Sequence, residues 1–236
     1  MDDRELARRA SVNFGEMLAT VGRWGVGPGA VLRRPDAVGA HIAALGDNPW
    51  FDAVVVPQGA HPPPDDPGLP FCMWTFADHA EGRVEDPSIA TPCMGIDLGD
   101  ARRPTADRAP VDVVVPAPDA VGAMNDRAYG SGPAFGPLAA RLRGGRVRTH
   151  GLEVDGRLAC VAMTLRLGDD LGIHYVATES DRRRQGLATL LLTEVMGRAR
   201  DDGASTATLQ ASPDGLPVYV RMGFRRVGLL HGLVRP

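Results

Sequence analysis

The segment 176–188 combines residue types that could bind a polyphosphate. It reads VATESDRRRQGLA, so an apolar stretch is followed by a polar turn and then by a glycine where a helix begins. The first turn of a helix leaves backbone N–H groups without intrahelical partners and carries the positive end of the helix dipole, so it attracts anions. Gly186 would let the backbone approach an anion closely, and the arginines at 182–184 add positive charge. The alternative is a solvated basic loop without a ligand.

Hydrophobic periodicity predicts the elements that position this segment. A buried strand is expected over 171–178, and a helix with apolar residues four apart is expected over 185–200. Two strands, 146–154 and 158–167, flank the pair Asp155-Gly156, which is typical of a tight hairpin turn. These elements predict an α/β (α+β) fold in which helices flank a mixed sheet. The other elements expected in this half are strands at 111–115, 204–211 and 224–234 and helices at 119–129, 136–143 and 216–222.

The first part of the chain has a less regular pattern. Apolar residues at steps of three and four predict an amphipathic helix over 6–21. The prolines of 61–70 indicate a long surface loop, because proline lacks the N–H that a strand ladder needs. The polar, proline-containing stretch at 100–110 indicates a linker between an N-terminal half, 1–99, and a C-terminal domain, 111–236. Short strands are expected in the N-terminal half at 30–34, 51–57, 69–77 and 93–98.

Composition excludes several classes of protein. With 236 residues, 44% hydrophobic and 23% charged, the chain has the balance of a globular protein, and it has no apolar run long enough to span a membrane. Three cysteines without CxxC spacing argue against a disulfide scaffold or a zinc ribbon, so no metal is expected. All 26 basic residues are arginine, which excludes Schiff-base chemistry on lysine.

Charge and the N-terminal sequence bear on partners and location. Residues 1–110 hold 10 Arg and 16 Asp or Glu, and residues 111–236 hold 16 and 13, giving −6 and +3 and a net charge of −3. This balance gives no reason to expect a nucleic-acid partner. The N-terminus MDDRELARRA is too charged for a secretory signal, so we expect a cytoplasmic protein without a membrane partner.

Two motifs in the C-terminal domain resemble the GCN5-related N-acetyltransferase (GNAT) superfamily. Arg183, Gly186 and Ala188 fit its R/Q-x-x-G-x-G/A signature. The stretch from Ala211 to Phe224, which contains PVYVRMGF, resembles its C-terminal motif N-x-x-A-x-x-L-Y-x-x-x-G-F. Both motifs occur in the family's order, and the resemblance covers about residues 111–236. It implies a mixed, mostly antiparallel GNAT-type sheet flanked by helices.

The resemblance implies acetyl-CoA as the acyl donor and places it on the backbone. In the superfamily the pyrophosphate rests on amides of the loop and helix start, and the pantetheine arm pairs with the preceding strand where two strands separate. Two positions depart from the family pattern, because Ser212 stands where asparagine is frequent and Thr178 where valine is frequent. Neither departure affects recognition through N–H and C=O groups. The implied coenzyme-binding residues are Val176, Ala177, Thr178, Arg183, Arg184, Gln185, Gly186, Leu187, Ala188, Thr189 and Ser212.

Acyl transfer to an amine needs a neutral nucleophile, a donor to the oxyanion and a proton for the departing thiolate. The resemblance implies that a backbone N–H on the Val176 strand is the oxyanion donor and that Tyr219 is the proton source. The alternative for Tyr219 is an aromatic side chain packed in the core below Gly223-Phe224. Cys160 is expected to be a small core residue and not a nucleophile, because direct attack on a thioester needs no enzyme thiol.

The candidate for the general base is His174. Strand alternation predicts that Gly172, His174, Val176 and Thr178 share one face, and histidine titrates near neutral pH. The alternative is a structural histidine, with Glu153 and Glu179 as reserve candidates for the base.

These features predict an N-acetyltransferase whose acceptor is a small-molecule amine such as an amino acid, an amino sugar or an antibiotic. The alternatives are O-acetylation, longer acyl transfer, thioester decarboxylation, or a non-catalytic module that binds acyl-CoA. The acidic N-terminal half suits a cationic acceptor, and its order of elements loosely resembles an acetyltransferase core that has lost the coenzyme loop. The sequence does not fix the oligomeric state and allows a homodimer.

Overall fold

The computed structural model describes residues 1–25, 27, 30–42, 48–58, 60, 68–76, 84–86, 89–101, 112–142 and 144–235. Most of the predicted loop at 61–70 and of the predicted linker at 100–110 lies outside these residues. The chain forms two compact units. Unit 1 comprises residues 1–94, 210–212 and 226–236, and unit 2 comprises 95–209 and 213–225. This division differs from the predicted one, because the last strand belongs with the N-terminal half.

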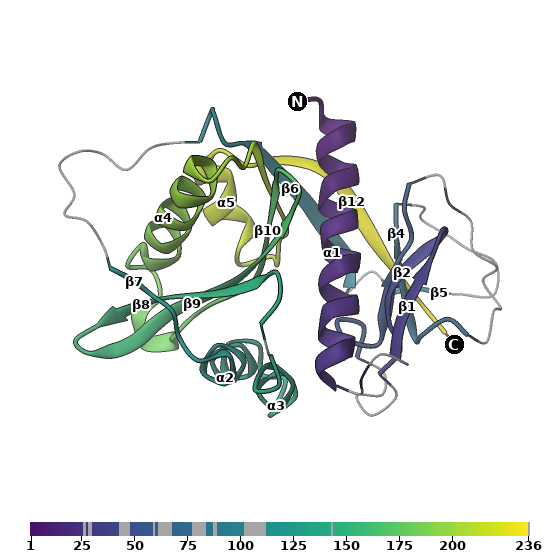
Figure 1. Cartoon of the computed structure of the whole chain (residues 1–236), viewed down its shortest axis with the longest axis horizontal. Helices are drawn as coiled ribbons and strands as arrows, with labels where there is room; N and C mark the ends of the chain where they lie inside the picture. Colours follow the sequence, from purple (N-terminus) through teal and green to yellow (C-terminus); the bar gives the residue numbers. More distant parts are fainter. Residues whose placement is uncertain are drawn as a thin grey trace. The chain divides into compact units, whose positions relative to one another are not determined.

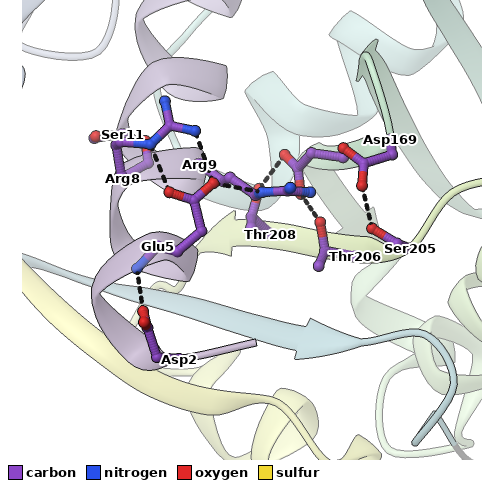
Figure 2. Close-up of polar contacts among 10 residues, drawn as sticks. Asp2, Glu5, Arg8, Arg9, Ser11, Asp169, Ser205, Thr206 and Thr208 are labelled. Carbon is purple, nitrogen blue, oxygen red and sulfur yellow. Dashed lines mark hydrogen bonds and ion pairs between the residues drawn. The ribbon is translucent and has the colours of Figure 1, made fainter.

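Unit 1 begins with helix α1, Asp3–Gly25, which contains the predicted helix at 6–21. Its apolar stripe is buried, and Leu6 and Leu18 are fully enclosed. The carboxylate of Asp2 accepts a hydrogen bond of 2.8 Å from the Glu5 N–H and so satisfies one of the unpaired donors at the helix start (Figure 2). Glu5 in turn pairs with the guanidinium groups of Arg8 and Arg9 one turn further along.

The sheet of unit 1 has the order β1-β2-β3-β4-β12, and β5 also pairs with β12. The β3–β4 pair is parallel, and the other pairs are antiparallel. Its core includes the rings of Phe14 and Trp74, whose centroids lie 5.8 Å apart, and Leu230 of the last strand. The strands are β1 Val31–Arg34, β2 Ala37–Ala40, β3 Ala53–Val55, β4 Cys72–Thr75, β5 Val84–Glu85 and β12 Arg225–Val234, and β6 Thr91–Asp97 runs from unit 1 into unit 2.

Unit 2 contains a sheet with the order β11-β10-β9-β8-β7, in which only the β10–β11 pair is parallel. Helices α4 and α5 lie on one side of this sheet and helices α2 and α3 on the other (Figure 1). The predicted mixed, mostly antiparallel sheet flanked by helices is therefore confirmed. The elements are β7 Val113–Val114, α2 Pro118–Tyr129, α3 Phe135–Ala139, β8 Val147–Val154, β9 Arg157–Leu167, β10 Asp170–Thr178, α4 Leu187–Asp201, β11 Thr206–Gln210 and α5 Leu216–Met222.

Two local features of unit 2 can be compared with the sequence. The predicted hairpin is confirmed, because Asp155 and Gly156 both have positive φ, 54° and 71°, and Val154 pairs with Arg157. Helix α3 is shorter than the predicted 136–143. The N–H groups of Arg141 and Leu142 bond to carbonyls three residues back, so the helix tightens into a 3₁₀-type turn and ends.

Among the residues that the structure describes, no helix combines the length and apolar character required to cross a bilayer.

Candidate functional site

Strand β10 pairs with β11 only over its first residues, 170–173. The carboxylate of Asp170 accepts hydrogen bonds from the hydroxyls of Thr206 (2.7 Å) and Thr208 (2.8 Å), and all three side chains are buried. Figure 2 shows the two threonines on β11 and the nearby contact between Asp169 and Ser205. The register ends at the Ile173–Leu209 pair, although β10 continues to Thr178. Within the described residues, the second half of β10 has no partner on β11, which ends at Gln210, so the pairing of the two strands stops there.

A β-bulge lies where the strands separate. His174 pairs with Met163 and Ala177 pairs with Val161, so three steps on β10 face two steps on β9. Within the bulge Tyr175 adopts φ 51°, a left-handed conformation that costs a non-glycine residue about 1–2 kcal/mol. A residue held in such a conformation is typical of functional sites, where the surrounding contacts maintain it.

The bulge also changes which side chains share a face. Met163 and Val161 are two residues apart on β9, so their partners His174 and Ala177 lie on one face. Thr178 pairs with Cys160 and lies on the opposite face. The prediction that Gly172, His174, Val176 and Thr178 share a face is therefore wrong, because the inserted residue reverses the alternation.

Two side chains from the α2–α3 region contact the bulge. The ring of Phe135 stacks on Tyr175 with a centroid distance of 4.0 Å and an interplanar angle of 27°. Asn125, in α2, donates from Nδ2 to the carbonyl oxygens of Tyr175 (2.9 Å) and Val121 (3.0 Å). Neither residue lies in a motif that the sequence singles out. The only available sign for Asn125 was a polar amide inside a helix, where asparagine is not favoured.

The separated part of β10 presents backbone carbonyls at its edge. The Glu179 N–H donates to the Ala159 carbonyl (3.0 Å), so the Thr178 carbonyl in the same peptide points away from β9. Because antiparallel pairing has a period of two residues, the Val176 carbonyl points the same way. This edge therefore offers acceptors to a ligand that pairs like an added strand.

Side chains hydrogen-bond both of these carbonyls. The Tyr129 hydroxyl donates to the Val176 oxygen (3.1 Å), and Arg183 Nε donates to the Thr178 oxygen (3.4 Å). Arg183 also donates to the Ala128 carbonyl (3.3 Å). The Arg183 side chain is therefore directed to backbone carbonyls, while its backbone belongs to the predicted phosphate loop.

The loop before α4 has the form expected of an anion site. Residues 183–186 are exposed, and Gly186 caps the helix with φ 77°. The first intrahelical bond runs from Leu190 to the Gly186 carbonyl (3.0 Å), so the donors of the first turn are the N–H groups at 187–189. A Cβ at Gly186 would meet no atom within 4 Å, and glycine is favoured there by the positive φ. The positive φ is therefore a second reason for glycine at this position, besides close approach of an anion.

Tyr219 lies in α5 and is 8% exposed. Its ring meets Phe224 edge-on at 5.9 Å, so the predicted packing is present. Burial raises the pKa of the Tyr219 hydroxyl, and the nearby Tyr129 and Cys160 raise it further. Burial likewise raises the pKa of the Cys160 thiol to about 11, and Thr178 Oγ1 lies 3.3 Å from its sulfur. Tyr219 and Cys160 are both protonated at neutral pH.

The candidates for the base lie in different surroundings. His174 is buried, and desolvation lowers its pKa to about 3, so its ring is neutral at pH 7. Glu179 forms an ion pair with Arg127 of α2. Glu153 is exposed near the end of β8. Ser212 is half-buried between β11 and α5.

Comparison with known proteins agrees with this arrangement. A family model described as an acetyltransferase (GNAT) domain matches residues 136–230. A GCN5-related N-acetyltransferase from Kribbella flavida has a similar structure, with a TM-score of 0.65 and 17% identity over 96% of this chain and 95% of that one. A putative GNAT-family acetyltransferase from Novosphingobium aromaticivorans gives a TM-score of 0.57 and 18% identity over 93% and 97%.

At these identities the two structures show a shared fold. No curated protein matches the chain by sequence. The family match runs from α3 into β12, and it contains both the loop before α4 and Tyr219. Residues 136–230 therefore match the model of an acetyltransferase (GNAT) domain, and the chain shares the fold of the two solved structures.

Proposed function

We propose that the protein is an acetyl-CoA-dependent N-acetyltransferase that acylates a small-molecule amine by direct attack on the thioester. The observation that carries this proposal is the bulged end of β10, which separates from β11 next to the exposed helix start of α4. A strand edge and a set of helix-start donors then lie one after the other along 176–189. This order suits a ligand with an amide-bearing arm and a pyrophosphate.

Acetyl-CoA would bind chiefly to backbone groups of the protein. The edge formed by Val176, Ala177 and Thr178 would pair with the amides of the pantetheine arm. The pyrophosphate would be held by backbone N–H groups of the loop and of the first turn of α4. These are the N–H groups of Arg183, Arg184, Gln185, Gly186, Leu187, Ala188 and Thr189. The half-buried Ser212 would add a hydroxyl near the start of α5.

The oxyanion and the leaving thiolate each need a hydrogen-bond donor of their own. We assign the oxyanion to a backbone N–H in the bulge, that of Val176, because a fixed dipole in a water-poor site stabilises developing charge without reorganisation. Tyr219 would donate a hydrogen bond to the departing thiolate. Its raised pKa supports this role, because the hydroxyl keeps its proton at every pH at which the enzyme would work.

His174 remains the proposed base. Lowering its pKa from 6.5 to about 3 makes full protonation of the ring less favourable by about 5 kcal/mol than for an exposed histidine. His174 can therefore act as the base only if its protonated form is short-lived. Otherwise the amine must bind in its neutral form. Glu179 is the reserve candidate, and it lies directly after β10.

The decisive experiment measures thiol release from acetyl-CoA with a panel of amino acids, amino sugars and aminoglycosides. Each amine is paired with the analogue that carries a hydroxyl in place of the amine, and acetyl-CoA binding is followed by calorimetry. We expect binding of acetyl-CoA and release of thiol with at least one amine but not with its hydroxyl analogue. Binding without release for any acceptor would favour a non-catalytic acyl-CoA module, and absence of binding would overturn the proposal.

A further inference from the structure

We propose that Asn125 is a positioning residue that fixes the orientation of the Tyr175–Val176 peptide and thereby aims the Val176 N–H. The inference rests on the proposed function, in which that N–H stabilises the oxyanion. It gives a specific task to a buried amide on α2 that lies outside both motifs in the sequence.

The direction of the Val176 N–H follows from peptide geometry. In a trans peptide the C=O and N–H groups point in opposite directions, and the described chain has no cis peptide. Asn125 Nδ2 lies 2.9 Å from the Tyr175 carbonyl oxygen and so holds that carbonyl toward α2. The Val176 N–H, in the same peptide, then points away from α2. Helices α4 and α5, which carries Tyr219, cover the opposite side of the sheet (Figure 1).

The bulge needs such a contact because its backbone is strained. The register of β10 with β9 omits both Tyr175 and Val176. Rotation of their shared peptide would exchange the positions of the N–H and the C=O. The Phe135 stack holds the ring of Tyr175, whereas the Asn125 hydrogen bond holds its carbonyl. The two contacts act on different parts of the residue, and only that of Asn125 selects the orientation of the peptide.

The other end of the Asn125 amide indicates which of its atoms matters. The residue is 4% exposed, and among described residues its Oδ1 has no hydrogen-bond partner. A buried unpaired acceptor destabilises a fold by about 1–3 kcal/mol, which an apolar residue of similar size would avoid. Packing alone therefore does not account for asparagine here, and its donor group, bonded to Tyr175 and Val121, does.

The neighbouring residue, Asp126, fixes the start of α3, which carries the Phe135 ring that stacks on Tyr175. Its carboxylate accepts hydrogen bonds from the backbone N–H groups of Phe135 and Gly136, each at 2.8 Å, and from the Ser131 hydroxyl at 3.1 Å. These bonds secure the start of α3 and so the ring that stacks on Tyr175. Two consecutive residues of α2 thus hold the two contacts on the bulge.

The test compares Asn125→Leu, which keeps the branching and the number of non-hydrogen atoms and removes the donor, with Thr149→Val. Thr149 is a matched control, because its buried hydroxyl donates to the Pro116 carbonyl (2.8 Å) and ties the segment before α2 to β8. For N125L we expect kcat to fall about 10- to 100-fold while the Kd for acetyl-CoA stays within 3-fold. For T149V we expect a lower melting temperature with kcat within 2-fold of wild type.

A second readout does not depend on activity. The ¹H–¹⁵N resonance of the Val176 amide should shift in N125L and stay in place in T149V, because only N125L frees the peptide. If the wild type releases no thiol with any acceptor, the proposed function fails, and this resonance still tests the positioning. If N125L does not fold, Asn125→Ala is measured in its place against the same criteria. A folded variant with wild-type kcat and an unmoved Val176 resonance would overturn the inference.

Discussion

The Tyr129 hydroxyl donates a hydrogen bond of 3.1 Å to the Val176 carbonyl oxygen. That oxygen is one of the two acceptors at the separated edge of β10 to which the pantetheine arm would bind. Tyr129 is 59% exposed, so its ring can move away without opening the core. The tyrosine and the proposed ligand would therefore compete for one acceptor.

Replacing Tyr129 with phenylalanine should strengthen coenzyme binding. The change removes the competing hydroxyl and leaves the ring, and a hydrogen bond of this kind contributes about 0.5–1 kcal/mol. We expect the Kd for acetyl-CoA, measured by calorimetry, to fall about 2- to 5-fold, with an unchanged melting temperature. Weaker binding by Y129F would show that the hydroxyl contacts the ligand and does not compete with it.

Replacing Tyr219 with phenylalanine should separate catalysis from binding. The variant keeps the edge-on contact with Phe224 and loses only the hydroxyl. If the hydroxyl acts on the departing thiolate, kcat should fall at least about 10- to 100-fold, while the Kd for acetyl-CoA changes less than 2-fold. Steady-state thiol release and calorimetry measure the two quantities. An unchanged kcat would leave Tyr219 with a packing role alone.

Two glycines near α4 offer a matched comparison. A Cβ would meet no atom within 4 Å at either Gly186 or Gly197, but only Gly186 has a positive φ. Gly186→Ala should strain the loop by about 1–2 kcal/mol and raise the Kd for acetyl-CoA about 5- to 30-fold. Gly197→Ala, inside the helix, should leave the Kd unchanged and raise the unfolding free energy by up to about 1 kcal/mol. Equal effects of the two changes on binding would contradict a role for the φ of Gly186.

Burial of His174 should make stability depend on pH. Its folded pKa of about 3 lies below the unfolded value of 6.5, so between these values the unfolded state binds more protons. The unfolding free energy should therefore rise with pH across this window, and at pH 5 His174 should account for a loss of about 2 kcal/mol relative to pH 7. His150, whose pKa burial and two arginines lower to about 4, acts in the same direction.

His174→Gln should therefore reduce the difference in urea-unfolding free energy between pH 7 and pH 5, leaving the part due to His150. The same variant tests the proposed base. If His174 accepts the proton of the amine, kcat should fall at least about 100-fold at pH 7 and recover at high pH, where the amine is neutral. Retention of wild-type kcat at pH 7 would transfer the role to another group.

Removing residues 1–99 should leave β12 without a partner and make the remainder aggregate. Strand β12 pairs with β4 from Val234–Cys72 to His231–Thr75, and its Leu230 and Leu233 are fully buried. Without β4 the strand edge is unpaired and about 1.5–3 kcal/mol of burial is lost at each leucine. We expect the 100–236 fragment to aggregate in size-exclusion chromatography, whereas the full chain stays soluble. A soluble fragment that acetylates the same amine at the same rate would contradict this expectation and the idea of an acetyltransferase-like N-terminal half.

The sequence by itself determined the local elements and the position of the loop that we propose binds the coenzyme. The helix of 6–21, the Asp155-Gly156 hairpin and the strand–loop–helix of 176–188 were predictable because periodicity and turn chemistry depend on neighbours in the chain. The motif resemblance and the family model agree over the same stretch, because Gly186 and Tyr219 both lie in short continuous motifs inside residues 136–230.

The tertiary structure alone decided the rest. The bulge between His174 and Ala177 places one extra residue of β10 opposite β9. The local sequence cannot predict it, because the register depends on the partner strand. Strand β12 completes the sheet of unit 1, more than half the chain away from β4, which is why the predicted domain boundary misplaced it. The contacts of Asn125 and Tyr129 with β10 join residues 50 and 47 positions apart, and only the folded chain brings such groups within hydrogen-bond distance.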